Sequence, residues 1–219
     1  MTNQPDPVGQ AGLQFFGRMS ASISHELKNV LAIIKENSGL LNDYLAMMAR
    51  GRPVDPERFQ IVGNRIEAQT RRADAIIKNL NQFAHTVDHP SSAVDLNQAL
   101  ELLMVLHQRM AAMHQVTLEP VPSQDPPVVV TTSPFLLLNA LGSVLAYALK
   151  SVPAGQAMSL EVISSEAETG IGFGLLKNLG DRPADEFPDA QGKVLLDAVG
   201  ARMRKNSQQG RIVIGLPRQ

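Results

Sequence analysis

The 219-residue chain contains no cysteine and no tryptophan, and its net charge at pH 7 is only −1. The absence of cysteine excludes disulfides and thiolate metal sites, and it fits the reducing cytoplasm, which is the location we expect. The balanced charge gives no broad attraction to nucleic acid or to a membrane surface, so we expect neither as a partner. The longest apolar run, residues 135–149, is shorter than a bilayer span and includes Asn139 and Ser143, so no membrane segment is expected.

Hydrophobic residues make up 44% of the chain, enough for a sizeable core in one large or two small domains. Clusters of proline, glycine and polar residues mark the boundaries between segments. They predict a disordered lead-in at residues 1–9, a helical hairpin at 10–88, a linker at 89–94 and an α/β domain at 95–219. Within the hairpin, we expect one helix over residues 9–50 and a second from residue 56 to about residue 86, joined by a turn.

Each expected helix carries an apolar seam with steps of three and four residues, which is the spacing of one helix face. The first seam is Ile23, Leu27, Val30, Ile34, Leu41, Tyr44 and Met48, with polar Asn37 among them. The second seam is Phe59, Val62, Ile66, Gln69, Ala73, Ile76, Leu80 and Phe83. A single hairpin of this length would leave much apolar surface wet, so we expect a homodimer that forms a four-helix bundle.

One histidine lies off the first seam. His25 follows Ile23 by two residues and therefore lies roughly 200° around the helix from it, facing solvent. A neutral imidazole is nucleophilic near pH 7, and the carboxylate of the adjacent Glu26 can raise its basicity. The pattern predicts a histidine that another protein can reach.

The segment SISHELKN, residues 22–29, resembles the H-box of two-component histidine kinases, in their dimerisation and histidine-phosphotransfer domain. The resemblance implies that His25 is the phospho-acceptor and that Glu26 orients its imidazole or accepts its proton. It also places Asn29 where these proteins keep a residue that positions water for dephosphorylating a partner. The family's proline is Val30 here. The partner-docking surface is expected at exposed positions near His25: Lys28, Asn29, Ala32 and Lys35.

The second domain is expected to begin with a helix capped by Asp95 and to continue with strands near residues 116–118, 128–131, 158–164, 170–177 and 211–216, and helices at 134–151 and 191–205. The strand at 128–131 is expected to be buried. This order resembles the catalytic ATP-binding domain of the same kinases, a Bergerat-type α/β sandwich. The fold class predicted for the whole chain is therefore α+β, a long helical hairpin followed by a degenerate ATPase-like domain.

The nucleotide-binding residues of that family are replaced. Tyr147 stands where the resemblance implies a magnesium-binding asparagine, and a phenol cannot supply the amide oxygen that Mg²⁺ prefers there. Asn178 replaces the aspartate that binds the adenine amino group, and Arg182 replaces a glycine of the same motif. Residues 182–192 offer one glycine, Gly192, among prolines and acids, which would repel a triphosphate. We therefore expect no ATP binding, no cofactor of the chain's own, and Mg²⁺ supplied with the partner's receiver domain.

Two other patterns favour structural roles. Thr169-Gly170-Ile171-Gly172-Phe173-Gly174 does not open a helix, so we expect a strand with glycines on one face and Ile171, Phe173 and Leu175 on the other, rather than a phosphate loop. His85 and His89 have the spacing of metal ligands but lack a third ligand, so no metal site is expected. His107 and His114 are expected to be ordinary polar positions.

The hypothesis that follows is a histidine phosphotransferase of a phosphorelay, which shuttles a phosphoryl group between His25 and the aspartates of response-regulator receiver domains, with a hybrid histidine kinase as one candidate partner. Two alternatives stay open. One is a divergent kinase that binds ATP. The other is a non-enzymatic pseudokinase or phosphatase that binds response regulators.

Overall fold

The computed structural model describes residues 6–122, 127–165, 168–181, 183 and 186–217. The chain divides into two compact units. One unit contains residues 19–82, which form most of the helical hairpin. The other contains residues 1–18 and 83–219, so the first turns of the first helix belong with the α/β domain.

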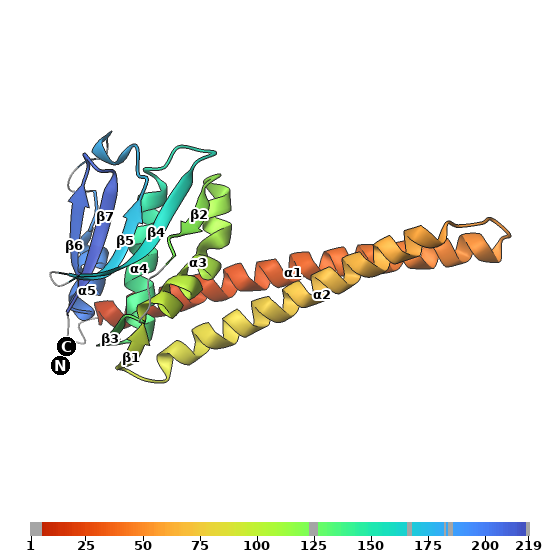
Figure 1. The fold of residues 1–219 in the computed structure, drawn as a ribbon. Helices are drawn as coiled ribbons and strands as arrows, with labels where there is room; N and C mark the ends of the chain where they lie inside the picture. Colours follow the sequence, from red (N-terminus) through yellow and green to blue (C-terminus); the bar gives the residue numbers. More distant parts are fainter. Residues whose placement is uncertain (1–5, 123–126, 166–167, 182, 184–185, 218–219) are drawn as a thin grey trace. The chain divides into compact units, whose positions relative to one another are not determined.

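The hairpin consists of α1, Pro7–Ala49, and α2, Pro56–Ala84, which run antiparallel (Figure 1). Gly51 takes a φ of 72° in the connecting turn, a backbone conformation that glycine adopts without strain. The Asp55 carboxylate accepts a hydrogen bond from the Glu57 N–H at 2.9 Å and caps α2. The predicted helix boundaries are confirmed to within a few residues, with α1 beginning two residues earlier than expected.

The two seams meet inside the hairpin, where the Tyr44 and Phe59 rings pack edge to face with centroids 5.5 Å apart. Every residue of the predicted second seam is buried or half-buried. The first seam is buried or half-buried except at Met48, which is 52% exposed, so that part of the prediction is wrong. Asn37 is tolerated in the seam at 4% exposure because its amide donates to the Ile33 carbonyl oxygen at 2.8 Å.

The α/β unit is built on a sheet with the order β2-β4-β5-β7-β6, five strands among the described residues. Its strands are β2 (Thr117–Pro120), β4 (Ala157–Ser164), β5 (Thr169–Gly174), β6 (Arg202–Asn206) and β7 (Arg211–Leu216). The helices α3 (Leu96–Met113), α4 (Pro134–Leu149) and α5 (Ala190–Ala198) lie against one face of it (Figure 1). The fold class, a helical hairpin followed by an α/β domain, is confirmed.

Three features differ from the expectations. The expected linker at 89–94 contains part of β1, Ser92–Asp95, which pairs antiparallel with β3, Val129–Thr132, in a separate two-stranded sheet. The expected buried strand at 128–131 corresponds to this β3, whose residues alternate between exposed and buried because it packs on one face only. The expected helix at 191–205 ends at Ala198, since Gly200 has a φ of 66°, and β6 follows.

The glycine-rich segment is the central strand β5, as predicted. Ile171 and Phe173 are fully buried on the helix-covered face. On the opposite face, a Cβ at Gly172 would lie 3.0 Å from Glu161, whose carboxylate pairs with Arg211 at 2.8 Å. Leu175, expected on the apolar face, instead follows the strand with a φ of 64° and is 51% exposed. The glycines therefore leave room for neighbouring side chains on this face of the sheet, and the segment forms a strand rather than a phosphate loop.

An aromatic cluster joins the first turns of α1 to the helices of the α/β unit. Phe15 packs edge to face on Phe83 at 5.6 Å, lies 5.7 Å from the Phe135 ring, and stacks on His107 at 6.3 Å, all measured between ring centroids. Phe15 and Phe83 are almost completely buried. Gly142 of α4 makes room for the cluster, because a Cβ there would lie 2.7 Å from His107 Nε2 and 3.4 Å from Phe15.

Gly142→Ala is expected to lower the free energy of unfolding by about 1–3 kcal/mol, because the buried imidazole cannot move away from the added methyl group. The matched control is Gly17→Ala in α1, where nothing lies within 4 Å of the added Cβ. That control should raise the free energy of unfolding by about 0.5–1 kcal/mol, the ordinary benefit of replacing a helical glycine. Urea unfolding of the two variants measures both effects. A similar gain in both would contradict the packing described for Gly142.

Candidate functional site

The helical phase of α1 determines where His25 lies. Ile23 and Val30 are buried in the seam, whereas His25 is exposed, as the sequence predicted. Glu26 is half-buried, and Lys28, Asn29, Ala32 and Lys35 are exposed on the same helix. The structure therefore brings all the residues predicted for the site into one three-turn segment of α1.

The imidazole of His25 has no hydrogen bond or ion pair within the described part of the chain, and this includes any bond to Glu26. Since α1 runs continuously from Pro7 to Ala49, the Val30 position does not interrupt the helix below His25. An exposed, unengaged imidazole on a continuous helix can act as a nucleophile toward a group presented by another protein.

The other four histidines differ from His25. His85 Nδ1 lies 2.8 Å from an Asp88 carboxylate oxygen in an exposed pair at the end of α2. His89 and His114 are exposed and lie outside any H-box-like sequence. Among the described residues, no group of three or more His, Cys, Asp or Glu side chains is arranged to hold a metal ion.

His107 was wrongly expected to be an ordinary polar position. It is 3% exposed, and its Nδ1 donates to the Leu103 carbonyl oxygen at 2.8 Å. Burial lowers its pKa from 6.5 to about 4, with the Leu103 hydrogen bond acting against the shift and the charge of Arg18 adding to it. A signal was present in the sequence, because His107 follows Leu103 by four residues on an apolar helix. It is a neutral core residue and not an acceptor of phosphate.

The position where the resemblance implies a magnesium-binding asparagine, Tyr147, lies in α4. Tyr147 is 4% exposed, and its ring stacks on Phe187 with centroids 5.1 Å apart and planes 18° from parallel. The Lys205 ammonium lies 4.6 Å from the centroid of the Tyr147 ring and donates to its hydroxyl at 3.3 Å. Asn178 is exposed just before a short 3-10 helix, Leu179–Asp181. Arg182 lies outside the described residues.

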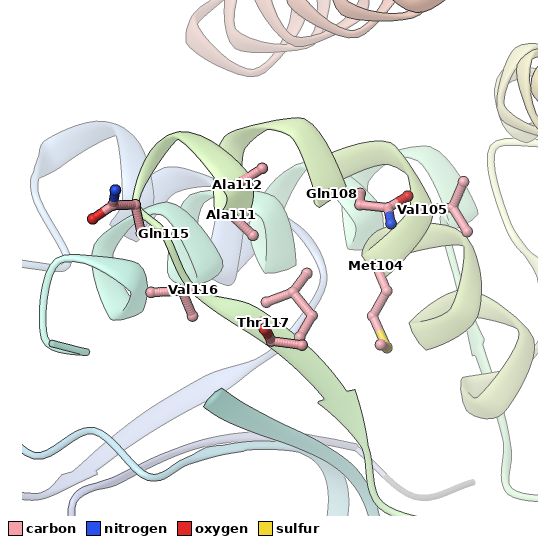
Figure 2. Close-up of a pocket in the computed structure, with 9 residues that line it drawn as sticks. Met104, Val105, Gln108, Ala111, Ala112, Gln115, Val116 and Thr117 are labelled. Carbon is pink, nitrogen blue, oxygen red and sulfur yellow. The ribbon is translucent and has the colours of Figure 1, made fainter. Parts of the chain in front are cut away.

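A separate groove of about 470 Å³ lies between α3 and β2, as Figure 2 shows. Its lining is apolar apart from two glutamine amides and one threonine hydroxyl: Met104, Val105, Gln108, Ala111, Ala112, Gln115, Val116, Thr117 and Leu118. None of these residues was predicted to be functional. None carries a charge, so the lining offers a phosphate no charged partner.

The H-box-like segment, residues 22–29, lies within a region that is similar to known phospho-acceptor domains. Residues 17–86 match the His Kinase A (phospho-acceptor) domain. The C4-dicarboxylate transport sensor protein DctB of Pseudomonas aeruginosa is 33% identical over 179 residues. That alignment covers 79% of this chain and 28% of the relative, so the chain spans little more than a quarter of the relative's length. The chain is thus a two-component histidine kinase-like protein.

Solved structures show partial similarity. The histidine kinase AdeS of Acinetobacter baumannii is 12% identical, with 88% of this chain and 96% of that chain covered and a TM-score of 0.44. A bacterial phosphotransferase solved at 1.7 Å is 15% identical, with 93% and 96% covered and a TM-score of 0.46. The histidine kinase ThkA, solved in complex with the response regulator TrrA, is 14% identical, with 93% and 61% covered and a TM-score of 0.44.

No helix among the described residues combines the length and the apolar character needed to cross a bilayer.

The displaced pKa of His107 predicts how stability depends on pH. The unfolded chain takes up a proton on this histidine near pH 6.5, whereas the folded chain does so only near pH 4. Stability from the neutral, buried ring is therefore present above pH 6.5 and is lost as the pH falls toward 4. Between pH 7 and pH 5, wild type should lose about 2 kcal/mol more unfolding free energy than His107→Gln. Urea titrations at the two pH values measure this difference.

The control for this titration is His114→Gln, which replaces an exposed histidine of the same unit. It should retain the full acid sensitivity of wild type. Equal acid sensitivity of wild type and His107→Gln would show that His107 is not the group responsible.

Proposed function

We propose that this chain is a histidine phosphotransferase, which moves a phosphoryl group between His25 and the aspartates of response-regulator receiver domains without charging itself from ATP. The observation that carries the proposal is an exposed, unengaged His25 within an H-box on the outer face of an amphipathic helix. Transfer between a histidine and an aspartate requires mainly positioning and charge neutralisation. A helix that presents His25 to a docked partner supplies the first of these.

In the proposed transfer, an imidazole nitrogen of His25 attacks the phosphorus of the receiver's aspartyl phosphate. A nitrogen–phosphorus bond forms, the bond from phosphorus to the aspartyl oxygen breaks, and the receiver's carboxylate leaves with the electron pair. The proton on the second ring nitrogen is left on a cationic ring, where the Glu26 carboxylate can stabilise or accept it. Mg²⁺ supplied with the receiver domain would neutralise charge on the phosphoryl oxygens. The reverse sequence returns the phosphoryl group from His25 to an aspartate.

The α/β domain supports the part of the proposal that excludes ATP. Mg²⁺ requires oxygen ligands in a near-octahedral arrangement, and Tyr147 presents a phenol that is packed against Phe187 and Lys205. Asn178 replaces a carboxylate with an amide, which loses the charged acceptor for an adenine amino group. These residues do not fit a nucleotide, so no step is assigned to one.

The partner surface proposed around His25 combines charge with small side chains. Lys28 and Lys35 can pair with the acidic pocket that a receiver domain presents, and Ala32 between them allows close approach. The histidine kinase ThkA was solved in complex with a response regulator, TrrA. By the same chemistry, receiver domains are the partners proposed here.

The chain is proposed to act as a homodimer whose two hairpins form a four-helix bundle. Within residues 19–82 of the hairpin, five large apolar side chains are more than 40% exposed: Leu31, Leu45, Met48, Ile61 and Ile77. A second copy of the hairpin would cover side chains of this kind and leave both His25 residues accessible.

Phosphotransfer from a panel of phosphorylated receiver domains tests the proposed activity. Wild type should acquire label from at least one receiver, and His25→Ala should acquire none, because no other accessible histidine has the H-box context. His114→Ala, which removes an exposed histidine elsewhere, should behave as wild type. Gel autoradiography after acid-free electrophoresis measures the label, since phosphohistidine is acid-labile.

The same assay distinguishes the alternatives. Stable label on His25 from ATP and Mg²⁺ alone would identify a divergent kinase and contradict the proposal. Receiver binding without transfer, unaffected by His25→Ala, would identify a non-enzymatic binding protein. Faster receiver dephosphorylation that is lost in Asn29→Ala would identify a phosphatase.

The homodimer is tested by its mass in solution. Wild type should elute at twice the chain mass of 23.7 kDa, and Leu31→Asp/Leu45→Asp should elute as a monomer, because burying two carboxylates in an apolar interface is costly. Met113→Asp is the control, since Met113 is 76% exposed outside the hairpin and should not affect the mass. Light scattering during size-exclusion chromatography measures it. A wild-type monomer at micromolar concentration would contradict the dimer.

A further inference from the structure

The aromatic contact of Tyr147 lies where the resemblance to the ATP-binding domain implies a magnesium ligand. Tyr147 and Phe187 are 4% and 7% exposed, and their rings stack at 5.1 Å. Phe187 belongs to the loop that precedes α5. The Phe187 ring therefore takes up the space beside Tyr147, where the resemblance implies a bound magnesium ion. Here both rings belong to the chain itself.

A cation completes this contact. Lys205 of β6 lies over the Tyr147 ring and donates to its hydroxyl oxygen. The ammonium group is attracted by the negative face of the ring and by the phenol oxygen together. Phe187 from the loop and Lys205 from β6 therefore both contact Tyr147 of α4.

The N-terminus of α5 is capped by a carboxylate of the chain itself, that of Asp189. Helix N-termini favour anions because their first N–H groups point outward without intrahelical partners. In this chain, the Asp189 carboxylate accepts the Gly192 N–H at 2.7 Å. An incoming phosphate would have to displace this carboxylate and would meet its negative charge.

Gly192 links the two contacts. A Cβ at this position would lie 2.8 Å from Phe187 Cε2 and 3.1 Å from the Asp189 carboxylate. Only glycine lets the phenylalanine ring and the capping carboxylate approach α5 together. The single glycine in the sequence of residues 182–192 thus serves packing and capping.

We infer that residues 187–192 act as an intramolecular replacement for a nucleotide. Phe187 fills the side of the position next to Tyr147, where the resemblance implies magnesium, and Asp189 fills the anionic side at the start of α5. The segment contacts α4 through Tyr147 and caps α5 through Asp189, so both contacts are made by the chain itself. This inference rests on the resemblance that places Tyr147 at a magnesium-binding position and does not depend on phosphotransfer at His25.

Tyrosine nitration of the full chain tests the inference, because the chain has only two tyrosines and no cysteine to compete for tetranitromethane. Peptide mass spectrometry separates Tyr147 from Tyr44, which serves as the internal reference. In wild type, Tyr147 should react slowly. In Phe187→Ala, its rate should rise by at least about tenfold, while Tyr44 keeps its rate.

The matched control is Phe16→Ala, which removes a phenylalanine that stacks on Phe83 in the aromatic cluster of the same unit. Tyr147 should stay protected in it. Phe187→Leu replaces the ring with a smaller apolar side chain and should give an intermediate rate, which keeps the test usable where Phe187→Ala unfolds. Circular dichroism checks that each variant is folded. Equal rates at Tyr147 in wild type and the Phe187 variants would overturn the inference.

Mg²⁺ and ATP provide the second readout. At millimolar concentration they should leave the thermal midpoint and the Tyr147 nitration rate of wild type unchanged, because the position is already filled. A rise of several degrees, or slower nitration, would show that a nucleotide enters and would overturn the inference. Neither readout involves His25, so a failed phosphotransfer experiment and a failed nitration experiment are distinguishable.

Discussion

The packing of α1 against α2 along an apolar seam is the interaction on which the function of the hairpin depends. Ile23 and Val30 must face inward, and the 3.6-residue repeat then directs His25 to solvent. A slip by one residue would rotate the histidine by about 100° and bring it toward the seam. The geometry of the proposed acceptor is therefore set by core residues on either side of it. The chemistry can then be left to a neutral imidazole, the adjacent Glu26, and whatever a partner brings.

The two units divide the proposed roles between them. The hairpin presents an imidazole, while the α/β unit holds a histidine kinase-like arrangement of sheet and helices whose distinctive positions carry packing residues. His107 in the aromatic cluster and Tyr147 beside Phe187 are both polar side chains turned to structural use. In each case a glycine, Gly142 or Gly192, provides the space. Side chains that would be chemical candidates in isolation are thereby committed to the core.

Much of this could be predicted from the sequence where one periodic signal dominated. The hairpin followed from its seams, the exposure of His25 from its helical phase, and β5 from glycines that alternate with Ile171 and Phe173. Predictions failed where tertiary contacts decided the outcome. The strand β1 exists because β3 pairs with it, and β6 follows a glycine that ends α5 early. His107 was misjudged although its place on an apolar helix indicated burial, whereas its stacking on Phe15, 92 residues away in the chain, could not be predicted from the local sequence. The contact of Phe187 with Tyr147 likewise joins distant segments.

In the proposed function, His25 receives its phosphoryl group from a partner protein. Phosphorus NMR of the chain tests this most directly, because a phosphorylated imidazole nitrogen has a resonance of its own. We expect this resonance to be absent after incubation with ATP and Mg²⁺ and to appear after addition of a phosphorylated receiver domain. In His25→Ala it should be absent under both conditions. Its appearance in wild type with ATP and Mg²⁺ alone would show that His25 is phosphorylated without a partner.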